Sequence, residues 1–200
     1  ILADMLTGKN VDPDKVPTEG ITGITNIDFA YARAAGMTIK LLARCRVTED
    51  GRLRALVAPF MLPVEHPLGR VDDVFNGVQV NCSMLGDAMF GGQGAGKLPT
   101  ASAVAADVMD CAMHQGRTVM RGWTAEEAEI ADAADVERRF FVRTKASGRE
   151  AVQQAFAGSS LLPKQDGGEL GFLIPAMKER EFDEKRRALG DVIRNRIRII

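Results

Sequence analysis

The chain has 200 residues, of which 46% are hydrophobic and 26% are charged, as is ordinary for a globular protein with enough chain for a core. Its formal net charge is −1, so no nucleic acid or anionic membrane surface is indicated as a partner, and no apolar run is long enough to span a bilayer. Three separated cysteines without a CxxC pair and only two histidines argue against a disulfide framework and a metal site, and they favour a reducing, cytoplasmic compartment.

The N-terminal third predicts helix, loop and helix. The chain begins ILADML, without an initiator Met, and this pattern resembles the latter part of an amphipathic helix, so we expect the chain to be the C-terminal part of something longer. A proline-containing loop over residues 10–17 follows. Thr25 and Asp28 then form a capping-box pair, and Gly36 is placed to end the helix, which predicts a helix over residues 26–35.

The middle of the chain predicts strands and one long helix. Asp50 and Gly51 mark a hairpin turn between two apolar runs. The pattern then predicts a loop, two further strands and a helix that Gly116 closes. The expected strands cover residues 38–47, 53–62, 77–84 and 86–90, and the expected helix runs to about residue 115.

Four glycines in six residues separate the last of these strands from the helix. They are Gly91, Gly92, Gly94 and Gly96. Bare backbone amides before a helix start suit a polar or anionic ligand, with Pro99 expected at the first helical position. The alternatives are a P-loop, which Leu98 and Pro99 disfavour because magnesium needs Ser or Thr there, and a tight turn that binds nothing.

The C-terminal part predicts a linker and then a βαββαβ unit. Thr124 and Glu127 form another capping-box pair, which indicates a short acidic helix in the linker. The adjacent residues Phe140 and Phe141 are interpreted as core. Arginines alternate along the last strand, where they could face RNA or form the solvated side of an edge strand, and we favour the edge strand. They are Arg194, Arg196 and Arg198.

Three runs resemble the homoserine dehydrogenase family. They are EGITGITNIDFAYARAAGMTIKLLA, HPLGRVDDVFNGVQV and GDAMFGGQGAGKLPTASAVAADV, and the resemblance covers residues 1–113. It implies an enzyme that interconverts L-aspartate 4-semialdehyde and L-homoserine with NADP or NAD, in threonine, methionine and isoleucine biosynthesis. It also implies a Rossmann domain followed by a mixed-sheet substrate and dimerisation domain, often with an ACT domain after it, and hence a homodimer here.

The resemblance places one part of the cofactor site in this chain. The family's GAG turn falls on Gly94, Ala95 and Gly96, which it implies close on the nicotinamide end through backbone atoms. The family's catalytic lysine, its companion aspartate and the glutamate for the homoserine amine lie upstream of the match, so no catalytic residue is expected here. Glu65 and His66 are assigned no catalytic role.

Four charged residues near the N-terminus do not match the family's catalytic motif, and we interpret them as solvated charges. They are Asp4, Lys9, Asp12 and Asp14.

The tail is similar to an ACT domain in element order. Its first strand-to-helix loop is the short KASGRE, in which only Gly148 corresponds to the residues that bind amino acids in ACT domains. A structural or dimerising role is therefore expected at least as much as regulation by threonine.

Together these patterns predict an α+β protein. A mixed sheet with helices on one face is expected over residues 1–116, a linker over 117–135 and a small ACT-like domain over 136–200. The expected function is that of a homoserine dehydrogenase fragment, and the alternative is a non-catalytic ligand-sensing and dimerisation module.

Overall fold

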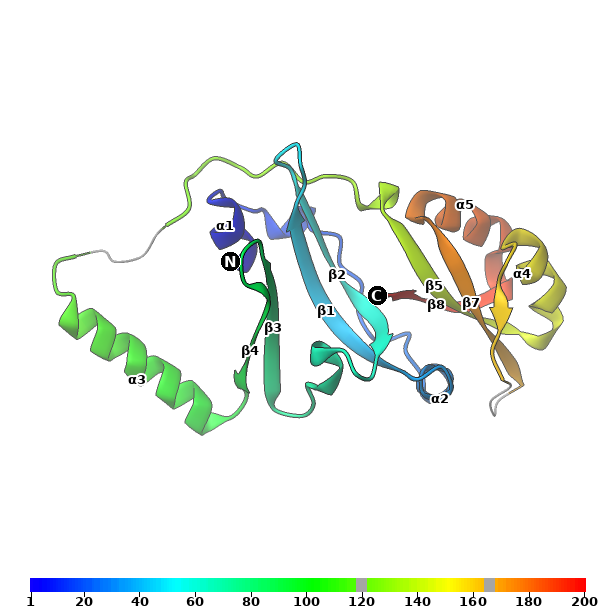
Figure 1. Ribbon diagram of the computed structural model, residues 1–200, viewed down its shortest axis with the longest axis horizontal. Coiled ribbons are helices and arrows are strands. Elements are labelled where there is room, and N and C mark those ends of the chain that lie inside the picture. Colours follow the sequence, from blue (N-terminus) through cyan, green and yellow to red (C-terminus); the bar gives the residue numbers. More distant parts are fainter. Residues whose placement is uncertain (118–121, 164–167) are drawn as a thin grey trace. The chain divides into compact units, whose positions relative to one another are not determined.

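A computed structural model of the protein describes residues 1–117, 122–163 and 168–200, and Figure 1 shows its elements. The chain forms two compact units. Unit 1 contains Ile1–Val64 and Trp123–Ile200, and unit 2 contains Glu65–Gly122. In the described ranges, no helix is both long and apolar enough to cross a membrane.

Unit 1 is built on a six-stranded sheet of order β1-β2-β8-β5-β7-β6. Its strands are β1 (Met37–Val47), β2 (Leu53–Pro63), β5 (Glu137–Lys145), β6 (Ser160–Leu161), β7 (Glu169–Lys178) and β8 (Ile193–Ile199). The β2–β8 pair is parallel and the other pairs are antiparallel, so the sheet is mixed and the predicted α+β class is confirmed.

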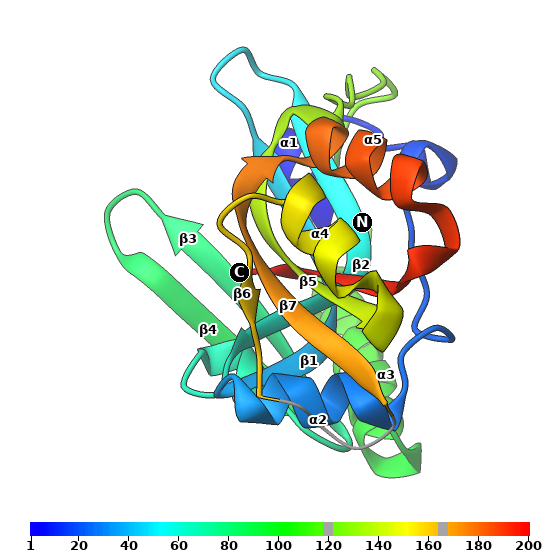
Figure 2. The same ribbon diagram turned by 90° about the vertical axis from the view of Figure 1, so that its right-hand side faces the viewer.

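Helices cover both faces of this sheet. They are α1 (Leu2–Thr7), α2 (Asn26–Ala34), α4 (Arg149–Ala155) and α5 (Glu179–Leu189), with 3-10 turns η1 (Pro13–Lys15), η3 (Ala133–Asp135), η4 (Ala146–Gly148) and η5 (Gly190–Val192). Successive side chains of a strand point to opposite faces. Phe140 therefore packs with Phe182 of α5 and Phe141 packs with Tyr31 of α2, while α4 and α5 lie over one face in Figure 2. Both phenylalanines are fully buried, which confirms them as core.

Helix α2 follows the local signals. Thr25 and Asp28 form the expected capping box, and Gly36 after the helix adopts a φ of 67°, which suits glycine. The C-terminal elements also occur in the predicted βαββαβ order, from β5 to β8. The predicted turn at residues 166–168 lies largely outside the described residues. The division into domains at residues 116 and 136 stays a prediction.

The interpretation of β8 as a solvated edge strand was wrong. This strand lies between β2 and β5, and the Arg198 side chain is only 3% exposed. Glu19 and Glu179 neutralise this arginine within the fold. These carboxylates are far from β8 in sequence, so the alternating pattern alone could not show them.

The short acidic helix predicted in the linker was also wrong. Residues 126–131 run extended, because their backbone groups bond to other segments. The N–H of Asn10 donates to the carbonyl of Glu126, and the carbonyl of Asn10 accepts from the N–H of Ala128. In the same pattern, the N–H of Leu53 donates to the carbonyl of Glu129, and its carbonyl accepts from the N–H of Ala131. We call residues 126–131 the strap.

Unit 2 contains a 3-10 turn, a hairpin and a helix. They are η2 (Pro67–Arg70), β3 (Phe75–Cys82), β4 (Gly86–Gln93) and α3 (Lys97–Met113). The hairpin is in antiparallel register from Phe75–Gln93 to Cys82–Gly86. Helix α3 begins two residues before Pro99, so this proline occupies the third helical position and not the first.

Candidate functional site

The glycine turn joins β4 to α3, and Gly96 has a clear local role in it. Gly96 precedes the first residue of α3 with φ 102° and ψ 163°, a conformation that a residue with a side chain rarely adopts. Its carbonyl accepts hydrogen bonds from the backbone N–H of Thr100 at 3.2 Å and from the Thr100 hydroxyl at 2.8 Å. The backbone therefore requires glycine at position 96.

Gly94 lies close against strand β3. Its N–H donates to the carbonyl of Val74 at 3.2 Å, and a Cβ at this position would overlap the side-chain amide of Asn76. By contrast, a Cβ on Gly92 would have no atom within 4 Å. Packing thus accounts for Gly94 and conformation for Gly96, while neither accounts for Gly92.

The first turn of α3 is free of acidic side chains. Leu98 is 75% exposed and supplies no hydroxyl, and Pro99 has no N–H, so the P-loop interpretation lacks both its magnesium ligand and one cradling amide. The unbonded N–H groups at a helix start still favour negative charge. The turn and this helix start can therefore hold a polar or anionic group through backbone atoms.

The loop between β2 and β3 contains Glu65 and His66. The His66 ring nitrogen Nδ1 accepts a hydrogen bond from the N–H of Leu68 at 3.2 Å and so caps η2. Glu65 is exposed. Among the described residues, no group of three or more His, Cys, Asp or Glu side chains is placed to hold a metal.

Of the charged residues near the N-terminus, Asp4 is buried. Asp4 is 6% exposed, and its Oδ1 accepts from the N–H of Val11 at 2.7 Å. Lys9 pairs with Glu126, and Asp12 accepts from the N–H of Asp14. The interpretation of Asp4 as a solvated charge was wrong, because it fixes the turn after α1.

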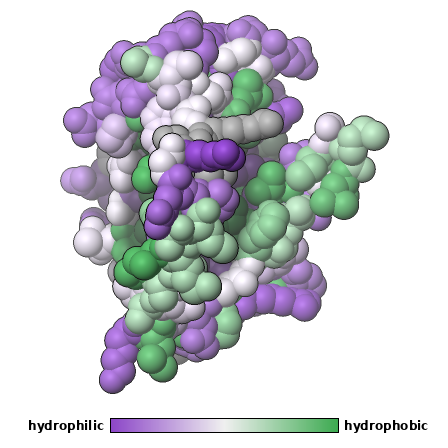
Figure 3. Space-filling view, turned by 90° about the vertical axis from the view of Figure 1, so that its left-hand side faces the viewer, coloured by the Kyte–Doolittle hydropathy of each residue, from purple (hydrophilic) through white to green (hydrophobic). Residues whose placement is uncertain are grey.

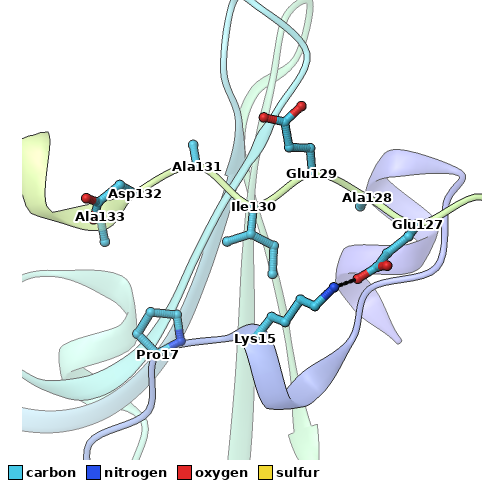
Figure 4. A pocket seen from close by; sticks show the side chains of 9 residues that line it. All are labelled: Lys15, Pro17, Glu127, Ala128, Glu129, Ile130, Ala131, Asp132 and Ala133. Carbon is cyan, nitrogen blue, oxygen red and sulfur yellow. Dashed lines mark hydrogen bonds and ion pairs between the residues drawn. The ribbon is translucent and has the colours of Figure 1, made fainter.

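A pocket of about 580 Å³ in unit 1 was not indicated by the sequence (Figure 4). Lys15 and Pro17 form one side of it, and residues 127–133 form the other. The Lys15 ammonium is paired with the Glu127 carboxylate, as the dashed line in Figure 4 marks. Both side chains of this ion pair are about half exposed, and we assign the pocket no catalytic role.

Apolar side chains are exposed across unit 2, and Figure 3 shows them gathered over α3 and the hairpin. On α3 they include Leu98, Val104, Val108, Met109 and Met113, and on the hairpin Phe75, Val78, Met89 and Phe90. Apolar surface of this extent is typical of a contact with another protein surface.

The family model described as Homoserine dehydrogenase matches residues 1–109 of the chain. A homoserine dehydrogenase of Mycobacterium tuberculosis is 39% identical over 163 residues, covering 78% of this chain and 37% of that protein. The Mycobacterium leprae protein is 48% identical over 119 residues, covering 58% and 27%. The Corynebacterium glutamicum protein is 35% identical over 196 residues, covering 94% and 42%. The chain thus spans less than half the length of these curated relatives.

Solved structures of homoserine dehydrogenases share the fold. The structure from Thiobacillus denitrificans has a TM-score of 0.78 at 23% identity. The match covers all of this chain and 51% of the chain in that structure. A structure from S. aureus has a TM-score of 0.72, with the same identity and coverage. At this identity the likeness concerns the fold alone.

Proposed function

The chain belongs to the homoserine dehydrogenase family, and from that premise we propose that it forms the substrate and dimerisation part of an NAD(P)-dependent oxidoreductase. In this proposal the whole enzyme interconverts L-aspartate 4-semialdehyde and L-homoserine in the cytoplasm, for threonine, methionine and isoleucine biosynthesis. The observation that carries it is the family match over residues 1–109, which includes the glycine turn.

The turn at Gly94, Ala95 and Gly96 is the proposed cofactor contact. NAD(P) supplies hydride chemistry when bound, and the turn would position its nicotinamide end against bare backbone. The absence of acidic side chains in the first turn of α3 and the open space at Gly92 both support this role. No residue of this chain matches the lysine and aspartate to which the family resemblance assigns proton chemistry, so those steps would fall outside it.

A homodimer is part of the proposal. The exposed apolar side chains of α3 and the β3–β4 hairpin support a surface that is covered in the assembled enzyme. The C-terminal βαββαβ unit is proposed to be structural. A Cβ on its Gly148 would overlap side-chain atoms of Thr144 and Val192, so packing explains this glycine without a bound amino acid.

The test is a chimera in which the part of the Mycobacterium tuberculosis relative that this chain does not match is joined to residues 1–200. We expect homoserine-dependent reduction of NAD⁺ or NADP⁺ by the chimera and none by the chain alone. A folded chimera that reduces neither cofactor would contradict the proposal. If residues 1–200 alone bound a free amino acid, the non-catalytic sensing module would take its place.

A further inference from the structure

One face of the β1–β2 hairpin carries arginines at facing positions. Arg46 lies opposite Arg54 in the antiparallel register, and Arg44 lies opposite Leu56, next to that pair. Side chains directly opposite each other on such a pair have Cβ atoms about 5 Å apart. We call Arg44, Arg46 and Arg54 the arginine cluster.

The cluster continues toward Phe60 on the same face of the sheet. The Arg44 guanidinium lies 5.5 Å from the centroid of the Phe60 ring, and that of Arg138 lies 5.9 Å from it. Phe60 in turn is in register with Arg198 of β8. The face therefore brings together residues from β1, β2, β5 and β8.

Positive charge on this face exceeds the negative charge that is paired with it. Glu179 forms ion pairs with Arg138, with an Nε–Oε2 distance of 3.1 Å, and with Arg198. Glu19 forms ion pairs with Arg196 and Arg198. The other nearby acids, Asp132 and Asp135, pair with Arg180. Among the described residues, no carboxylate lies within ion-pair distance of any member of the arginine cluster.

Two further observations show that this charge is not simply solvated. The Nε of Arg54 is buried and has no hydrogen-bond partner among the described residues, although a buried donor left unpaired is costly. Burial also lowers the pKa of the Arg44 guanidinium. For Arg138, burial lowers the pKa, Glu179 raises it, and the charges of Arg44 and Arg198 lower it further. An acceptor at this position would relieve all three effects.

We propose that the arginine cluster binds a polyvalent oxyanion of the phosphate class. Planar guanidinium groups donate paired hydrogen bonds to phosphate oxygens. The register places Arg44 and Arg46 on the strand facing Arg54, whose Nε is unpaired. Arg44 and Arg46 reach the surface, so an anion can enter from solvent. All residues of the site belong to unit 1, whereas the glycine turn belongs to unit 2, so the proposal does not depend on the proposed hydride transfer.

The test is calorimetric titration of the whole chain with pyrophosphate, at constant ionic strength set with sodium chloride. Arg44→Gln and Arg54→Gln should each weaken binding by at least about tenfold, because each removes a charge-assisted contact. Arg33→Gln is the matched control, since Arg33 is an exposed arginine of α2 and its loss should leave the affinity unchanged. Inorganic phosphate, with fewer oxygens, should bind more weakly than pyrophosphate, and NADP⁺ in a parallel titration would reveal a cofactor phosphate as the source.

A location test makes the outcome independent of folding effects. Pyrophosphate should shift the Nε–H nuclear magnetic resonance signal of Arg54 in the unmutated chain. Arg46→Gln leaves the buried Nε of Arg54 in place, and it should make this shift smaller at the same pyrophosphate concentration. Equal affinity in the unmutated chain, Arg44→Gln and Arg54→Gln would overturn the site. So would an unmoved Arg54 signal at saturating pyrophosphate, or no binding at low salt.

Discussion

The carboxylate of Glu19 is held by both terminal nitrogens of Arg198, with Oε1–Nη2 and Oε2–Nη1 distances of 2.8 Å each. Arg196 adds contacts of 3.1 and 2.7 Å to the same carboxylate, and the Nε of Arg198 donates to Glu179 at 2.8 Å. The segment before α2 is thereby fastened to the last strand, 179 residues away. We call this contact between Glu19 and the two arginines the clasp.

The clasp should contribute measurably to stability. Glu19→Gln removes the charge that faces two arginines of low exposure, and we expect the free energy of unfolding in urea to fall by about 1–3 kcal/mol. Glu129→Gln is the control, because its side chain is 77% exposed and lies 4.0 Å from Arg52, where ion pairs contribute little. Equal effects of the two substitutions would contradict the clasp.

The clasp should also make stability depend on pH in the acid range. Burial alone would raise the pKa of Glu19, but hydrogen bonds from Arg198 and the charges of Arg196 and Arg198 outweigh it and lower the pKa to about 2 from 4.5. A carboxylate with a depressed folded-state pKa stabilises the fold above its unfolded-state pKa, and this contribution is lost as pH falls from about 4.5 through about 2. Urea midpoints measured from pH 5 to pH 2 should therefore fall more steeply in the unmutated chain than in Glu19→Gln. Parallel curves would count against the assignment.

A second ion pair joins α2 to the sheet. Arg143 donates from Nε to Oδ1 of Asp28 at 2.8 Å and from Nη2 to Oδ2 at 3.2 Å, and Asp28 is fully buried. Asp28→Asn should lower the free energy of unfolding by about 3–5 kcal/mol, because a buried charge loses its partner. Asp14→Asn, at an exposed site, should change it little. A small effect at Asp28 would mean that Glu169, which also pairs with Arg143, suffices.

Gly171 of β7 leaves room for the aromatic contact between α2 and the sheet. A Cβ there would lie 2.6 Å from Cδ1 of Tyr31 and 2.9 Å from Cε2 of Phe141. Gly171→Ala should therefore destabilise the chain by about 1–3 kcal/mol in urea unfolding, through overpacking. Gly20→Ala, where nothing lies within 4 Å, should not. Equal stability of the two variants would show that the rings can move aside.

The glycine turn allows packing and cofactor contact to be separated. Gly94→Ala should destabilise unit 2, seen as faster amide hydrogen exchange in β3, because the new Cβ overlaps the Asn76 amide. Asn76→Ala in the same chain should restore protection. If the turn contacts the cofactor, the double variant should still bind NADPH more weakly than the unmutated chimera does. Gly92→Ala is a companion variant, because its Cβ would have no atom within 4 Å. A loss of NADPH affinity in this variant would therefore come from the covered backbone and not from disturbed packing. Full recovery of affinity together with protection would leave the turn a purely structural one.

Elements whose signals are local could be predicted from the sequence. The capping box and Gly36 bound α2, Asp50 and Gly51 mark the β1–β2 hairpin, and the glycine turn separates β4 from α3. The order of the last six elements also followed from alternation and turn residues. The candidate cofactor turn belongs to this group, since its glycines and the following helix are contiguous. These features depend on backbone conformation over a few residues, which nearby side chains dictate.

Which strands pair and which charged side chains meet became visible in the folded chain and could not be read from the sequence. The periodicity of a strand shows which side chains share a face, but it does not show which strands lie beside it. The alternating arginines therefore indicated an edge strand, although β8 lies between β2 and β5. The strap does not form the helix that its capping-box pair predicted, because its backbone groups hydrogen-bond to Asn10 and Leu53 instead. Likewise, the partners of Arg198 and the lack of partners around Arg54 depend on residues far away in sequence. Strand pairing and Coulomb energy depend on distance in space, and a linear pattern does not contain that distance.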